Sequence, residues 1–254
     1  MYKFIFIVFI LVLFSIFSIP LKIFAISQFI EIGGKTIFIS DIHLNLNSKK
    51  IEIEDAKNLV IVGDLFAIPK IFEIFSNGSK DELKDELISK RYLKIQQGFS
   101  KVLGYFNKIP ENLYYIPGNM DPIYLKNFSF KCNETNVYGL NNIVAFKINN
   151  ITIVAHHGHF IAKGRIDFLI SLITKRLRKP LLLEKLWKNK LLKKLNLDNF
   201  WLIVGHSHIP AIDYKEKIAN CGGWKDYILK KAERAYVVVE DNNILLKHVD
   251  KVKS

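Results

Sequence analysis

Five short apolar segments of this chain each run directly into side chains that can bind a metal ion. The segments are rich in Ile, Leu and Val, and they are residues 36–40, 59–63, 113–116, 151–155 and 201–205. Runs of this length and composition are typical of buried β-strands. Because strand ends in α/β proteins meet at one edge of a sheet, we expect the polar residues that follow to lie close together.

The remaining apolar patterns predict the rest of the fold. Further strands are expected at residues 143–148, 217–220, 235–240 and 244–248, and a helix at residues 79–105. Strands separated by helical segments come first, and closely spaced strands follow. We therefore predict an α/β protein: a four-layer αββα sandwich of two mixed β-sheets, with an N-terminal hydrophobic helix and a helical insertion.

The first thirty residues differ from the rest of the chain. Residues 4–21 contain no charge and lie between Lys3 and Lys22, and they are nearly long enough to cross a bilayer core. We expect a membrane anchor with a single N-terminal span, and a cytoplasmic location is favoured for the rest of the chain. A cleaved signal peptide and a helix buried in the core are alternatives. Residues 31–254, which contain no linker or repeat, are expected to form one domain.

Positive charge is concentrated in one stretch of the chain. The net charge is +13, and residues 163–198 contain eleven Lys or Arg against three acidic residues. Apolar residues at helical spacing on both sides of Pro180 predict two amphipathic helices in this basic insertion. Either these helices pack on the core with their lysines in solvent, or they lie on a membrane of anionic lipid. Nucleic-acid binding is not expected, because few aromatic residues interrupt the basic ones.

The placement of the histidines indicates a metal site. Six of the seven histidines directly follow the five apolar segments. The polar residues in these places are Asp41, His43, Asp64, Asn119, Asp121, His156, His157, His159, His206 and His208. Their oxygen and nitrogen donors suit Mn²⁺, Fe, Zn²⁺, Co²⁺ or Mg²⁺. Two such ions roughly 3.5–4 Å apart would clamp a phosphoryl group and activate water. Cys132 and Cys221 lack zinc-site spacing and are either free thiols or a disulfide pair.

The five loops together resemble the ordered motifs of the calcineurin-like metallophosphoesterases. The motifs are SDIHLN at residues 40–45, GDLF at 63–66, PGNMD at 117–121, HGH at 157–159 and GHSHIP at 205–210. The resemblance spans residues 36 to about 224. It implies a site for two divalent ions, with Mn²⁺ expected first. One ion would be bound by Asp41, His43 and His208, the other by Asn119, His157 and His206, and Asp64 would bridge them.

The resemblance also implies roles for residues around the ions. His159 matches a histidine that faces the site in a simple-phosphodiesterase branch of the family. Asp121 is expected to orient the Asn119 loop or to share the role of general acid with His159. His156 is one residue from His157 on a strand, so we expect it to point to the opposite side and to be structural.

One position departs from the family pattern. Most members have a histidine after the motif asparagine that protonates the leaving group, but this chain has Met120, which cannot transfer protons. The small phosphodiesterases and the UDP-diacylglucosamine pyrophosphate hydrolases also lack that histidine. The resemblance therefore implies a preference for phosphodiesters or pyrophosphates over alkyl monoesters. The second branch carries a helical lid over lipid chains where residues 163–198 lie here, which suggests a lipid-linked substrate.

The sequence thus predicts a metal-dependent phosphoesterase that acts on a phosphoester substrate. The alternatives are a non-catalytic scaffold on the same fold and a basic nuclease.

Overall fold

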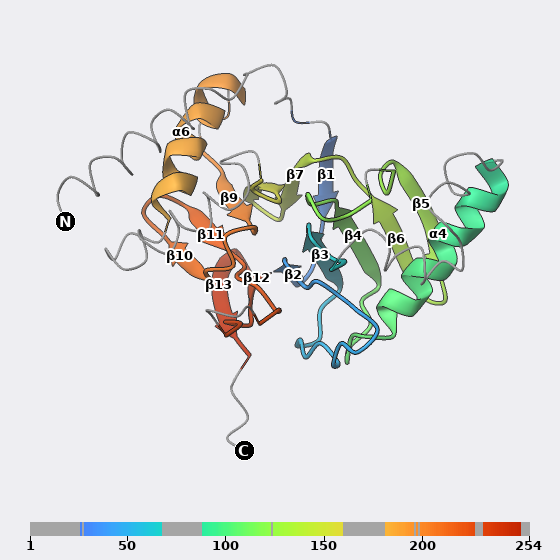
Figure 1. Ribbon diagram of the computed structural model, residues 1–254. Coiled ribbons are helices and arrows are strands. Elements are labelled where there is room, and N and C mark those ends of the chain that lie inside the picture. Colours follow the sequence, from blue (N-terminus) through green and yellow to red (C-terminus); the bar gives the residue numbers. More distant parts are fainter. Residues whose placement is uncertain are drawn as a thin grey trace.

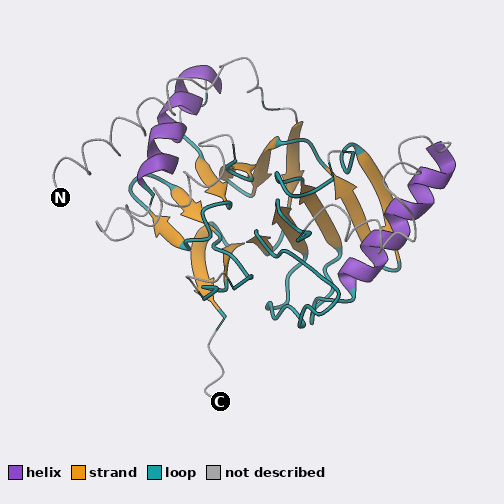
Figure 2. Ribbon diagram, in the orientation of Figure 1, coloured by secondary structure: helices purple, strands orange, loops and turns teal. Residues whose placement is uncertain are grey.

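The computed structural model describes residues 26, 28–67, 88–122, 124–159, 181–195, 197, 199–226 and 231–249. Two β-sheets pack against each other, and one helix lies on the outer side of each sheet (Figures 1 and 2). The structure thus has two sheets and two helices within the part of the chain that it describes.

The first sheet contains seven strands among the described residues, in the order β13-β12-β2-β3-β4-β6-β5. Their bounds are β2 Thr36–Ile39, β3 Asn58–Val62, β4 Asn112–Ile116, β5 Phe128–Cys132, β6 Thr135–Gly139, β12 Ala235–Glu240 and β13 Asn243–His248. Neighbours from β2 to β6 are parallel, whereas β5, β12 and β13 pair antiparallel at the two edges. The carboxyl ends of β2, β3 and β4 therefore share one edge of this sheet.

The second sheet contains six described strands in the order β1-β7-β8-β9-β11-β10. Their bounds are β1 Gln28–Ile32, β7 Ile143–Ile148, β8 Ile151–His156, β9 Trp201–Val204, β10 Ala211–Asp213 and β11 Ile218–Asn220. Strands β8 and β9 are parallel, so their carboxyl ends also lie at one edge. The five predicted segments thus become β2, β3, β4, β8 and β9.

Alternating side chains along the strands build three separate layers of core. On β2, Ile37 faces the core under one helix, whereas Phe38 faces the core between the two sheets. On β8, Ile153 faces the core between the sheets, whereas Val154 faces the core under the other helix. Each sheet is therefore buried on both faces, as near-continuous apolar strands require. This arrangement confirms the predicted αββα sandwich.

The two described helices are α4 (Ile88–Leu103) and α6 (Leu182–Leu195). Helix α4 covers the first sheet and confirms residues 88–103 of the helix predicted at 79–105. Residues 79–87 lie outside the described part. Helix α6 is the second predicted helix of the basic insertion, and the first one falls within residues 160–180, which the structure does not describe. Leu183, Trp187 and Leu191 of α6 are buried against the second sheet. Of the two arrangements predicted for the insertion, the structure therefore shows that the apolar side chains of α6 pack on the core.

Four strands were not expected from the sequence: β1, β5, β6 and β10. Three of them, β1, β5 and β10, are edge strands with half-buried or exposed residues, so they lack the apolar runs that mark the central strands. β6 is interrupted by polar Asn136 and ends at Gly139. Strand β1 begins at Gln28, before residue 31, where the sequence places the start of the main domain.

The predicted membrane location is corrected by the structure. Among the described residues, no helix is long and apolar enough to cross a membrane. Helices α4 and α6 contain 16 and 14 residues with several lysines each, whereas a transmembrane helix needs about 20 apolar residues. The predicted span itself, residues 4–21, lies outside the described part of the chain.

Candidate metal centre

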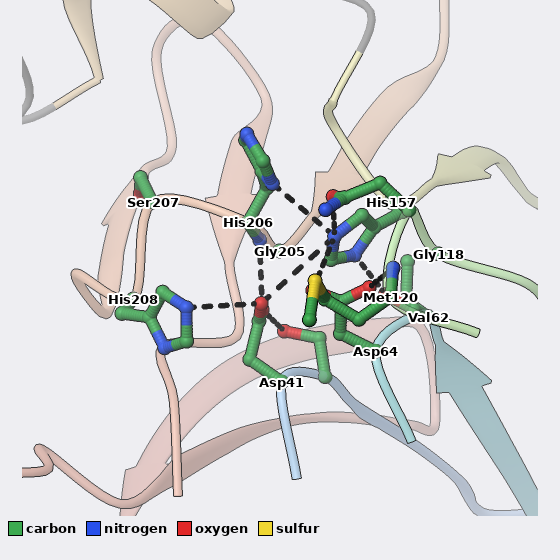
Figure 3. A network of polar contacts seen from close by, with 12 residues as sticks. Asp41, Val62, Asp64, Gly118, Met120, His157, Gly205, His206, Ser207 and His208 are labelled. Carbon is green, nitrogen blue, oxygen red and sulfur yellow. Dashed lines mark hydrogen bonds and ion pairs between the residues drawn. The ribbon is translucent and has the colours of Figure 1, made fainter. Parts of the chain in front are cut away.

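The five loops that follow β2, β3, β4, β8 and β9 converge on one place (Figure 3). They bring two groups of three potential ligands together, and within each group one donor atom of every residue lies within 4.8 Å of the others. The first group is Asp41, His43 and His208, and the second is Asp64, His157 and His206. All six were predicted as ligands from the sequence.

The first cluster is built around one carboxylate oxygen. Oδ1 of Asp41 lies 3.4 Å from Nε2 of His208 and 4.0 Å from Nε2 of His43. The two imidazole rings stack, with their centroids 5.2 Å apart and an interplanar angle of 11°. The three side chains thus point at a common volume.

The second cluster is built around His157. Its Nδ1 lies 3.0 Å from the carbonyl oxygen of Val62, which can only accept, so Nδ1 carries a hydrogen and donates it. Its Nε2 faces Oδ1 of Asn119 at 3.1 Å and Nδ1 of His206 at 3.3 Å. A histidine that binds a metal commonly donates its other N–H to a backbone carbonyl in this way. Asn119, the seventh predicted ligand, therefore lies with the second cluster.

Asp64 belongs to the second cluster and also faces the first. Its Oδ2 is 3.3 Å from Nε2 of His157 and 3.9 Å from Nε2 of His43. Its Oδ1 accepts a hydrogen bond from the backbone N–H of Met120 at 2.8 Å. One oxygen is thus fixed by the loop after β4, and the other faces histidines of both clusters.

The backbone is strained at most of these residues. Asp41, His43, Asp64, His206 and His208 all have positive φ angles, between 48° and 68°. Non-glycine residues seldom adopt this left-handed region, and such strain is concentrated at functional sites. The strained residues form two pairs with one residue between them, Asp41 with His43 and His206 with His208. Both side chains of each pair reach the site.

Two glycines show how tightly the loops pack. Gly63 has a φ of 80°, and a Cβ placed there would lie 2.5 Å from the ring of His157. A Cβ at Gly118 would lie 2.2 Å from Oδ1 of Asp64. Any side chain at these positions would displace a predicted ligand, which explains the glycines of the GDLF and PGNMD motifs.

Burial and charge shift the pKa values of the cluster residues. Burial alone would lower the pKa of His157, but the carboxylates of Asp64 and Asp41 raise it to about 10. Burial would raise the pKa of Asp64, but the charge of His157 holds it well below its usual range. Burial lowers the pKa of His43 to about 4. The carboxylates therefore attract positive charge to the place where a cation would bind.

The donor set fits divalent cations. Oδ1 of Asp41 is fully buried and accepts no hydrogen bond from the described residues, while it faces histidine nitrogens. Its Oδ2 accepts hydrogen bonds from Ser40 Oγ at 2.6 Å and from the backbone N–H of His206 at 2.7 Å. A buried carboxylate oxygen left without a donor is costly unless a cation completes its surroundings. Oxygen and imidazole donors without sulfur match the metals predicted from the sequence.

His159 and His156, two residues of the HHGH segment, lie on different sides. The ring of His159 lies beside the rings of His157 and His206, with centroid separations of 5.6 and 6.4 Å. The ring of His156 points away and accepts a hydrogen bond from Nε1 of Trp187 at 2.8 Å. The predicted structural position of His156 is confirmed.

Asp121 joins two loops instead of facing the clusters. Its Oδ1 accepts a hydrogen bond from the backbone N–H of Phe66 at 3.0 Å, and its Oδ2 accepts one from Gly118 at 2.8 Å. Burial, followed by the nearby charge of Asp64, raises the pKa of Asp121 to about 6. These contacts link the loop after β3 to the loop after β4.

The sequence marks the segment NCGGW at residues 220–224 as a turn near the site, but it does not predict which side chains hold the loops from behind. Asn220, fully buried, donates to the carbonyl oxygen of Gly205 and to Oγ of Ser207, both at 2.9 Å. The hydroxyl of Ser40, whose hydrogen is donated to Asp41, also lies 3.1 Å from the carbonyl oxygen of Gly222. The segment NCGGW at residues 220–224 thus supports the loops of Asp41 and His206. In the sequence, the paired glycines of this segment indicate a place where another part of the backbone approaches closely.

A family model for calcineurin-like phosphoesterases matches residues 34–239, most of the chain. This chain belongs to the calcineurin-like phosphoesterase family. No curated protein matches the sequence. Among solved structures, Vps29 from Entamoeba histolytica complexed with Zn²⁺ is similar at 14% identity, with 85% of this chain and 98% of that chain covered and a TM-score of 0.38.

Two further solved structures show distant similarity to this calcineurin-like family member. Vacuolar Protein Sorting 29 from Cryptosporidium parvum has 14% identity, coverage of 86% of this chain and 99% of that chain, and a TM-score of 0.43. The phosphoesterase YfcE from E. coli has 15% identity, coverage of 83% and 90%, and a TM-score of 0.38. Family membership rests on the sequence match and not on these distant similarities.

Proposed function

We propose that this protein is a two-metal phosphoesterase that hydrolyses a phosphodiester or pyrophosphate bond. The position of Asp64 supports this function most directly, because its Oδ2 faces His157 of one cluster and His43 of the other. A carboxylate so placed is suited to bridge two cations. The six imidazole and carboxylate side chains of the two clusters together form a set of ligands that suits divalent cations.

Each cluster would hold one divalent ion, with Mn²⁺ as the first expectation and Fe, Zn²⁺, Co²⁺ or Mg²⁺ as alternatives. One ion would be held by Asp41, His43 and His208, the other by Asn119, His157 and His206, and Asp64 would be shared. Bound divalent ions activate water and neutralise charge on phosphoryl oxygens. Ser40 and the backbone of His206 keep one oxygen of Asp41 occupied, so that the other is presented to the site.

His159 is proposed to contact the phosphoryl group of the substrate. Its ring lies beside those of His157 and His206 and is only half-buried, so substrate can reach it. Asp121 is proposed to orient the loops after β3 and β4, because both of its oxygens already accept backbone hydrogen bonds from them.

Met120 sets the substrate class in this proposal. Its backbone N–H donates to Asp64, and its thioether lies at the site (Figure 3). Most relatives have a histidine that acts as a general acid at this position. General acids contribute about 10²- to 10⁴-fold to rate, so substrates that need one would react slowly. Diesters and pyrophosphates with good leaving groups are therefore favoured. A lipid-linked substrate stays a prediction from the sequence alone.

The test is hydrolysis of bis-p-nitrophenyl phosphate and p-nitrophenyl phosphate by the full chain, with Mn²⁺ and with EDTA. We expect faster cleavage of the diester, its loss in EDTA, and a decrease in kcat of about 100-fold or more for Asp64→Asn. Asp241→Asn makes the same chemical change in an exposed turn between β12 and β13 and should leave kcat unchanged. Bound metal without cleavage of either ester would favour the non-catalytic scaffold instead.

A further inference from the structure

Helix α6 makes two buried polar contacts with residues next to the proposed metal ligands. Nε1 of Trp187 donates to Nε2 of His156 at 2.8 Å. Oε1 of Glu184 lies 3.3 Å from Nδ2 of Asn220. All four residues are at most 4% exposed. Because a buried polar group left without its partner is costly, these contacts constrain how the helix sits on the sheet.

The contact with Trp187 fixes the ring of His156. An indole N–H can only donate, so Nε2 of His156 must be the acceptor, and a neutral ring then carries its hydrogen on Nδ1. The two rings meet edge to face, with centroids 5.9 Å apart and an interplanar angle of 73°. His156 is the last residue of β8 and directly precedes His157. Holding the ring of His156 therefore holds the strand end from which His157 projects in the opposite direction.

The contact with Glu184 reaches the other histidine loop. Asn220 donates to the carbonyl of Gly205 and to Ser207, the two residues that flank His206. Its amide has two hydrogens and three acceptors within reach, and Glu184 is the most distant of the three. The contact of Trp187 is thus the stronger of the two connections between α6 and the site.

We propose that Trp187 is a positioning residue that holds His157, through His156, in the geometry that binds metal. This inference rests on the proposed two-metal function and extends it to the basic insertion, whose helix α6 carries Trp187. The insertion then supports the metal centre from behind the second sheet, in addition to closing the apolar core there.

The test measures Mn²⁺ binding to the full chain by isothermal titration calorimetry. Trp187→Phe keeps a large aromatic ring but removes the N–H donor. Loss of residues that orient a metal-binding histidine typically costs 10- to 100-fold in affinity. We expect Trp187→Phe to weaken Mn²⁺ binding about 10-fold or more. His156→Gln, which retains an acceptor, should bind Mn²⁺ more tightly than His156→Leu, which has none.

A matched variant separates positioning from general destabilisation. Leu191 lies one turn further along α6 than Trp187 and is buried in the apolar core. Leu191→Ala therefore removes apolar contacts and leaves the polar contacts of the helix in place. It should lower Tm at least as much as Trp187→Phe but leave Mn²⁺ affinity within twofold of wild type. Equal affinity of Trp187→Phe and wild type would overturn the inference, as would an equal loss in Leu191→Ala. Failure of the wild-type chain to bind Mn²⁺ and each of the alternative divalent ions would instead overturn the proposed function, and this inference with it.

Discussion

Asp64 and His157 meet through a single carboxylate oxygen: Oδ2 of Asp64 lies 3.3 Å from Nε2 of His157. The other oxygen of Asp64 is held by the backbone of Met120, and the other nitrogen of His157 is held by the carbonyl of Val62. Backbone groups therefore orient both side chains, and one donor atom of each faces the candidate metal centre. Orientation of this kind is what a metal ligand requires before the metal arrives.

Gly205→Ala should damage the centre through a steric clash alone. A Cβ at Gly205 would lie 2.3 Å from Oγ of Ser40 and 2.4 Å from Oδ2 of Asp41, so those groups must move. We expect a loss of about 1–3 kcal/mol in the free energy of unfolding and weaker Mn²⁺ binding, measured by denaturation and calorimetry. Gly33→Ala is the matched control, because a Cβ there meets nothing within 4 Å. Equal behaviour of the two variants would contradict the packing described here.

Met120→His should change the substrate preference. The new imidazole would stand where most relatives have their proton donor and could protonate a poor leaving group. We expect turnover of an alkyl phosphomonoester to rise about tenfold or more, while turnover of bis-p-nitrophenyl phosphate changes little. Steady-state kinetics with both substrates measure the ratio. An unchanged ratio would show that Met120 does not determine the substrate class.

Asn112→Ala should lower stability without affecting the centre. The amides of Asn58, Asn112 and Asn136 form a ladder across the amino-terminal ends of β3, β4 and β6, with contacts of 3.0 Å. This end of the strands is opposite to the candidate metal centre. Removal of the middle amide leaves two partners unpaired, so we expect a loss of about 1–3 kcal/mol in unfolding free energy. Mn²⁺ affinity, measured on the folded variant, should stay at the wild-type value.

Cys221 should be unreactive in the folded protein. Both cysteines are free thiols and buried, and burial, together with the charge of Asp41, raises the pKa of Cys221 well above its usual range. The thiolate is the reactive form, so a thiol of raised pKa reacts slowly. Titration with Ellman's reagent at pH 8 should detect two thiols in guanidinium and none within minutes in buffer. Rapid reaction of the native wild type that is absent from Cys221→Ser would contradict this expectation.

The central strands and the candidate metal ligands could be found in the sequence because their signals are local. Each of β2, β3, β4, β8 and β9 is a short apolar run, and each is followed by polar residues in the motif order of the family. The alternation of Ile37 and Phe38 between two cores could not be read in the same way, because a strand buried on both faces shows no polar alternation.

The supporting residues were missed because their partners are distant in the sequence. Asn220 contacts Gly205, and Ser40 contacts Gly222 across 182 positions. Trp187 belongs to the apolar pattern that predicts an amphipathic helix after Pro180, and its hydrogen bond to His156 depends on how α6 docks on the second sheet. Such contacts follow from the tertiary arrangement and have no signature in a single sequence.

The most direct test of the two-metal centre is electron paramagnetic resonance during titration of the full chain with Mn²⁺. We expect two Mn²⁺ ions per chain and a spin-coupled signal, because Asp64 faces both clusters and would be shared by both ions. Asp64→Asn should lose the coupled signal while the fold, followed by circular dichroism, is retained. A single isolated Mn²⁺ signal at saturation, or no binding of Mn²⁺ and of the alternative divalent ions, would contradict the two-metal centre.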